Sequence, residues 1–152
     1  MKSLITRALT FVSLAVAITS AAASAQAQSV KRLKFDIPFD STVGKTVLPA
    51  GEYTLQVQDA MTTKALILRK ADGTVVMSSL NTIPVLSRRS EDRPKLVFNR
   101  YGDQYFLAQF WDAGTEYGRQ FQKSRVEREL ANGARTAKAD ATKNQVTLMA
   151  RQ

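Results

Sequence analysis

The sequence predicts a mainly β protein, an antiparallel β-sandwich or small β-barrel of about eight or nine short strands with one short C-terminal helix. Apolar and polar residues alternate with a period of two in several short segments, which is typical of half-buried strands. Turn-forming residues separate these segments at a spacing typical of sandwiches and small barrels. One segment carries a helix-start signal. An α+β fold with more helix around 124–142 is the alternative, and Gly133 weakens it because glycine destabilises a helix interior.

The first 27 residues predict a secretory signal peptide, which lies outside the folded domain. Lys2 and Arg7 supply the basic start, residues 8–18 are largely apolar, and the small residues Ala25 and Ala27 fit a cleavage site. The apolar run is shorter than the about 20 residues that span a membrane, although a retained anchor is the alternative. We therefore expect a single β-rich domain over 28–152, exported to the periplasm or the cell exterior.

The first strands of this domain are predicted from alternation and from turn residues. Residues 33–39 alternate, and Pro38 places this strand at a sheet edge or at the strand's own end. Pro49 and Gly51 stand at the second and fourth positions of a turn that precedes a strand over 53–58. A hairpin should follow, with arms at 65–70 and 74–80, a turn at 71–73, and the second arm continuing through Ile83 and Val85.

The second half of the domain begins with a charged segment, 87–94, which has no apolar residue and predicts a solvated loop. A hairpin follows, with a turn at 101–104 and an aromatic strand over 105–111. We expect Tyr105, Leu107 and Trp111 on one face of this strand and Phe106, Ala108 and Phe110 on the other. Both faces would then be covered, which favours a central position. A turn at 112–114 precedes a short strand at 118–121.

The helix signal begins at Ser124, which can cap the amide of Glu127 while the Glu127 side chain reaches back to the cap residue. Val126 and Leu130 would share one face, and Gly133 would provide a left-handed stop after about two turns. The polar stretch 134–144 is typical of a flexible connection, with a frayed helix as the alternative. Alternation at Val146, Leu148 and Ala150 predicts a terminal strand that returns to the sheet.

Four linked phrases resemble a family of small exported β-rich proteins common in Acidobacteria. They are Phe-Asp-Ile-Pro-Phe at 35–39, Leu-Pro-Ala-Gly-Glu-Tyr at 48–53, Leu-Val-Phe-Asn-Arg-Tyr-Gly-Asp at 96–103 and Lys-Ser-Arg-Val-Glu-Arg-Glu-Leu at 123–130. The resemblance covers nearly the whole mature chain. It implies export and a mostly β fold, and it carries over no activity and no site residue.

Composition restricts the chemistry of this protein. The chain has no Cys and no His, so thiol nucleophiles, disulfides, zinc–thiolate sites, the usual metal ligand and the common general base are all excluded. We therefore expect no enzyme, no cofactor and no metal site. A carboxylate-dependent hydrolase, with Asp103 paired with Asp112 or Glu116, is the weakest alternative, and the turn after Trp111 has only a faint likeness to an aspartic-protease loop.

The formal net charge of +9, with 22 basic residues against 13 acidic ones, favours anionic partners. Much of the excess is C-terminal, and we expect an anion-binding surface there, formed by Arg119, Lys123, Arg125, Arg128, Arg135, Lys138 and Lys143. A solvated face that maintains solubility is the competing interpretation. Tyr101, in a turn, is the candidate for an exposed aromatic contact.

The function that these features favour is that of an exported, non-catalytic binding module. Its partner would be an anionic polysaccharide, lipid head groups or another envelope protein, and export argues against nucleic acid. The alternative is a β-barrel that holds a small apolar ligand, which requires an interior not filled by side chains.

Overall fold

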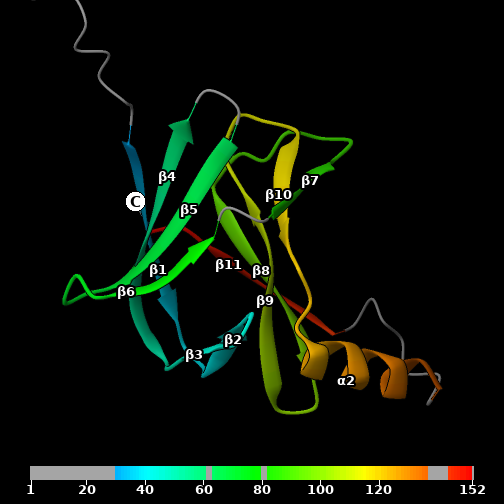
Figure 1. The fold of residues 1–152 in the computed structure, drawn as a ribbon. Helices are drawn as coiled ribbons and strands as arrows, with labels where there is room; N and C mark the ends of the chain where they lie inside the picture. Colours follow the sequence, from blue (N-terminus) through cyan, green and yellow to red (C-terminus); the bar gives the residue numbers. More distant parts are fainter. Residues whose placement is uncertain (1–29, 61–62, 80–81, 137–143, 152) are drawn as a thin grey trace, which may run out of the picture.

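The computed structural model describes residues 30–60, 63–79, 82–136 and 144–151. Within these residues the fold is a sandwich of two β-sheets with one helix (Figure 1). The smaller sheet has the order β1 (Val30–Ile37), β4 (Gly51–Ala60), β5 (Thr63–Lys70) and β6 (Val75–Ser79). The larger sheet has the order β11 (Gln145–Met149), β8 (Lys95–Tyr101), β9 (Gln104–Trp111), β10 (Tyr117–Phe121) and β7 (Thr82–Leu86). The short strands β2 (Ser41–Val43) and β3 (Thr46–Leu48) pair with each other, and β2 also pairs with β9. The helix α2 (Arg125–Thr136) follows β10.

The predicted fold class is confirmed in its sandwich form, and the closed-barrel alternative is wrong. A closed barrel would need continuous pairing between the edge strands of the two sheets. On one side, β1 and the segment after β11 are joined only by an isolated bridge between Lys34 and Arg151 within the described residues. At the opposite side of the sandwich, β6 and β7 are the outermost strands of their sheets within the described residues. Within the part of the chain described, there are eleven strands, two or three more than predicted, because the short hairpin of β2 and β3 gave no periodic signal.

The core fills the space between the two sheets. The inward positions of β1 and β4 carry the apolar residues of their alternating patterns, and those of β8 and β9 face them. The largest fully buried side chains are Phe35, Phe98, Ile37, Leu48, Leu55, Leu66, Leu68 and Leu96. Phe39 packs against this core, with its ring stacked on Tyr105 at 3.9 Å and edge-on to Phe98 at 5.3 Å between centroids.

The prediction that the hairpin arm at 74–80 continues through Ile83 and Val85 is wrong. Strand β6 ends at Ser79, and Ile83 and Val85 belong to β7, which pairs with β10 in the other sheet. The chain therefore crosses between sheets near this point. The edge position of β7 also accommodates Pro84, which has no amide hydrogen for a second neighbour.

Strand β9 lies in the middle of the larger sheet, as predicted, but its faces differ from the prediction. A bulge lets Leu107 pair with Phe98 and Phe110 pair with Leu96, so Leu107 and Phe110 both join the core. Trp111 is thereby turned to the outer face. An extra residue in one strand reverses the alternation beyond it, and no glycine or other sequence signal marks the place.

The predicted cap of the helix is confirmed, and the predicted length of about two turns is wrong. The Ser124 Oγ accepts a hydrogen bond from the Glu127 amide at 3.1 Å. The helix continues through Gly133 to Thr136, so Gly133 is not its stop. Val126 is 55% exposed, whereas Glu127 faces the sheet and is buried. Of the predicted flexible connection 134–144, the first three residues are helical and 137–143 lie outside the described residues.

The predictions of a terminal strand and of a solvated charged loop agree with the structure. The terminal strand is β11, which pairs antiparallel with β8. The charged loop 87–94 has largely exposed residues, and backbone hydrogen bonds from Ser87 to Glu116 and from Gly114 to Glu91 hold it against the turn after β9. The signal peptide over 1–27 lies outside the described residues. Within the described residues, no helix is both long and apolar enough to cross a membrane.

Candidate anion-binding surface

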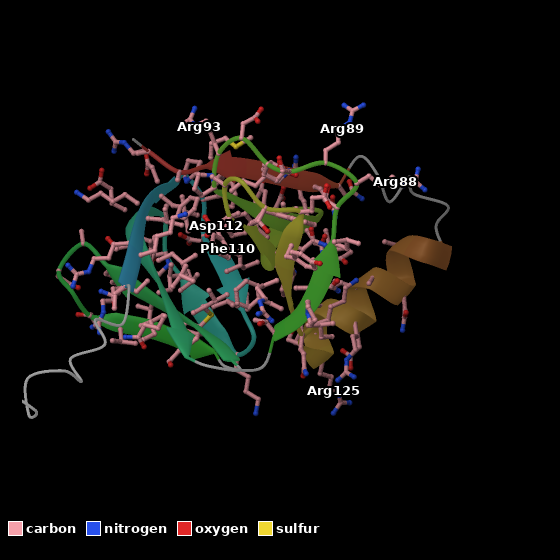
Figure 2. The ribbon with its side chains drawn as sticks, turned by 90° about the horizontal axis from the view of Figure 1, so that it is seen from above. Arg88, Arg89, Arg93, Phe110, Asp112 and Arg125 are labelled. Carbon is pink, nitrogen blue, oxygen red and sulfur yellow. The ribbon has the colours of Figure 1, made fainter. Side chains whose placement is uncertain are left out.

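The structure places three of the predicted basic residues together, at the start of α2. Lys123, Arg125 and Arg128 are exposed, and we call them the cationic helix start. Figure 2 shows Arg125 pointing away from the body of the protein. Arg125 forms an exposed ion pair with Glu129 at 2.9 Å. Within the described residues, Arg128 has no ion pair, and the Lys123 ammonium contacts only the Tyr101 hydroxyl, at 3.4 Å.

Glu127 lies between these cations in the sequence but is not part of the exposed surface. Its side chain is turned from solvent, with 4% of its surface exposed, and its Oε1 accepts a hydrogen bond from Asn99 Nδ2 at 2.9 Å. The Asn99 Oδ1 in turn accepts a hydrogen bond from Gln145 Nε2 at 3.1 Å. The Glu127 side chain was predicted to reach back to the cap residue Ser124. It instead contacts Asn99 of β8, which in turn contacts Gln145 of β11. Three exposed cations then stand against one exposed carboxylate, that of Glu129.

The other predicted basic residues do not join this surface, or their side chains are not described. Arg119 pairs with Phe110, a core residue of β9, and so lies on the inner face of the larger sheet. Gln120 lies on the opposite face and lines a small pocket beside Glu127 and Lys123. Arg135 is in the helix, but its side chain is outside the described part. Lys138 and Lys143 lie outside the described residues.

Tyr101 is less exposed than predicted. It is the last residue of β8 and is half-buried, with its ring edge-on to Phe106 at 5.9 Å between centroids. Its hydroxyl lies beside Lys123. The residue therefore supports one end of the cationic helix start and does not present an open stacking face.

Two exposed arginines outside the predicted set, Arg88 and Arg89, lie in the charged loop before β8. Figure 2 shows them at a different place on the surface from Arg125. The third arginine of this loop, Arg93, instead donates a hydrogen bond to the Ala150 carbonyl at 2.7 Å and holds the C-terminal segment. The arginine content of the loop was visible in the sequence, but its division into exposed and structural members required the fold.

The proposed pairing of Asp103 with Asp112 does not fit the geometry. Asp103 precedes β9 and Asp112 follows it. An extended strand of this length separates its ends by roughly 25 Å, far more than the 5–10 Å between the paired carboxylates of glycosidases. Asp112 forms an ion pair with Lys31 from the other sheet, and its Oδ1 accepts a hydrogen bond from the Ala113 amide at 2.8 Å. Across the described residues, Asp and Glu side chains form no group that could hold a metal ion.

No known protein family, curated protein or solved structure matches this chain.

Proposed function

We propose that this protein is an exported, non-catalytic β module that binds an anionic component of the cell envelope through the cationic helix start. The observation that supports this most is the exposure of Lys123, Arg125 and Arg128 within six residues, while Glu127 of the same segment is buried against the sheet. A cluster of exposed cations raises the local potential and attracts polyanions. The envelope as the location rests on the predicted signal peptide.

The position of these charges on the helix supports binding over solubility alone. The start of a helix carries a partial positive charge, so cations there are disfavoured and carboxylates are stabilising. Arg125 and Arg128 occupy the first turns of α2, while Glu127 of the same turn follows the usual preference for a carboxylate. The positive helix end and the guanidinium groups together provide a field that suits phosphate, sulfate or carboxylate groups.

The test compares two double charge reversals in the mature protein. Arg125→Glu with Arg128→Glu removes the cationic helix start, and Arg88→Glu with Arg89→Glu makes the same change of net charge in the distant loop. We expect wild type to bind a sulfated polysaccharide column, and vesicles with anionic head groups, less tightly as salt rises. The first variant should elute at much lower salt, and the second should elute close to wild type.

Comparison of the two probes distinguishes a polysaccharide from a lipid partner, since preferential binding to one identifies the source of the anionic groups. Vesicles of neutral lipid should bind neither variant nor wild type. Equal losses in the two variants would show that only net charge matters and would contradict a site on the helix. Both variants should remain folded, with melting temperatures close to that of wild type, because exposed ion pairs and charges at a helix start each contribute little to stability.

A further inference from the structure

Arg119 is a cation on the inner face of a sandwich sheet. On β10 it pairs with Phe110 of β9 and with Pro84 of β7, and directly paired residues project to the same face. Phe110 belongs to the core, and Arg119 itself is half-buried. Its guanidinium makes no hydrogen bond or ion pair with any described residue. A charged residue at this position is unusual, because the inner faces of a sandwich normally carry apolar residues.

Arg119 lines a pocket of about 200 Å³ at the end of the sandwich. Val57 from the smaller sheet, and Pro84, Phe110 and Tyr117 from the larger one, form apolar walls. Figure 2 shows Phe110 and Asp112, which also lines this pocket, close together between the sheets.

The charges around this pocket leave Arg119 unbalanced. Asp112 is paired with Lys31, which reaches across from β1. The charge of the Asp112 carboxylate is therefore balanced by Lys31. Arg119 is the other charged residue that lines the pocket, and no described residue provides a counter-ion for it. A guanidinium at an apolar wall is suited to a planar anion, which it can bind through two parallel hydrogen bonds.

We propose that this pocket binds a small organic anion, a carboxylate attached to a short apolar chain. The carboxylate would lie on the Arg119 guanidinium, and the chain would contact Val57, Phe110 and Tyr117. A dry cavity of about 150 Å³ holds a benzene-sized ligand, so a pocket of this volume suits a chain of about six carbons. The site is separate from the cationic helix start. Arg119 faces the inside of the sandwich, whereas its neighbour Gln120 faces the opposite side of the sheet and lies beside Lys123.

The experiment uses ¹⁵N-labelled mature protein, with hexanoate as the probe and hexylamine as a matched cation. Titration of hexanoate should shift the amide resonances of Gly118 and Arg119. Hexylamine should bind at least ten times more weakly. Butanoate and acetate should bind progressively more weakly than hexanoate, by about fourfold for each CH₂ group removed if each one is fully buried. Equal binding by hexanoate and hexylamine, or no dependence on chain length, would overturn the proposal without any need for a variant.

Substitutions test which residues form the binding site. Arg119→Gln should weaken hexanoate binding at least tenfold, Arg119→Lys should keep part of it, and Tyr117→Ala should reduce the gain per CH₂ group. The control is Arg128→Gln, which removes the same charge from the helix and should bind hexanoate as wild type does. Undiminished binding by a folded Arg119→Gln protein would contradict the assignment. The variant with both Arg125→Glu and Arg128→Glu should still bind hexanoate, so this site and the proposed polyanion surface can fail independently.

Discussion

Trp111 is the single tryptophan of the chain, and its burial depends on the absence of a side chain at Gly118. A Cβ atom at Gly118 would lie 2.6 Å from the Trp111 ring, closer than packed atoms approach. The indole Nε1 donates a hydrogen bond to Gln109 Oε1 at 3.0 Å, and the Lys95 ammonium lies 5.8 Å from the ring centroid. The predicted burial of Trp111 is confirmed at 8% exposure, although the ring covers the outer face of the sheet and not the core.

Replacing Trp111 by Ala should lower the free energy of unfolding by about 3–5 kcal/mol, the range for deleting a buried aromatic side chain. Gly118→Ala should cost about 1–3 kcal/mol, because the added methyl group displaces the ring, and it should shift the tryptophan emission. Denaturant melts measure both changes.

The control is Gly133→Ala in α2, where an added Cβ meets open space. This change should stabilise the protein by about 0.5–1 kcal/mol and leave the emission unchanged. An unshifted emission spectrum for Gly118→Ala would contradict the close contact between the ring and β10.

Tyr53 links the turn before β4 to the core. Its hydroxyl donates a hydrogen bond to the Pro49 carbonyl at 2.6 Å, and burial, with a smaller contribution from the Asp40 charge, raises its pKa above the ordinary value of 10.0. Because the folded state favours the neutral phenol, its contribution to stability is complete below pH 10 and is lost as pH rises through the folded-state pKa.

Tyr53→Phe should therefore cost about 1 kcal/mol at pH 7, the value of one hydrogen bond. The gap in stability between wild type and variant should narrow above pH 10, since only wild type has this phenol to ionise. Urea melts at pH 7 and above pH 10 make the comparison. A gap that widened with pH would mean that Tyr53 is not held in its neutral form.

At the scale of elements, local sequence signals correctly predicted the helix α2 and the strand β9. They did not predict where α2 ends or which side chains of β9 share a face. The cap at Ser124 starts the helix where the capping pattern indicates. Gly133 did not end it, because glycine lowers helix stability by only about 1 kcal/mol, and contacts made by a helix can compensate for this. In β9 the aromatic pattern identified a central strand, while the bulge changed which side chains share a face.

Ser124→Ala should lower the free energy of unfolding by about 1 kcal/mol, because the Glu127 amide loses its hydrogen-bond acceptor. The effect should be confined to α2, which amide hydrogen exchange of the first helical turn can measure. Ser90→Ala is the matched control, since Ser90 is exposed in the charged loop and should tolerate the change. An unchanged unfolding midpoint for Ser124→Ala would show that the helix start does not depend on this cap.

At the scale of the whole molecule, β1 begins at Val30, close to the predicted cleavage site. Cleavage after Ala27 would leave two residues before the first strand, so removal of the predicted signal peptide would leave the described pairing of β1 with β4 intact. Protein recovered from the periplasm or the cell exterior should therefore have an intact mass that corresponds to a start at Gln28. Recovery of the chain with Met1 from outside the cytoplasm would contradict the signal-peptide prediction.

The sequence by itself determined the strands with regular alternation, the helix cap and the excess of basic charge, because each depends on neighbours within a few residues. Only the tertiary structure decided that β7 joins the other sheet, that a bulge turns Trp111 outward, and that Glu127 is buried on Asn99. The same holds for Arg119. The sequence predicted only a basic residue in a short strand, and its pairing with Phe110 places it on the inner face of the larger sheet. Such features depend on which strands are neighbours, a property that local periodicity does not encode.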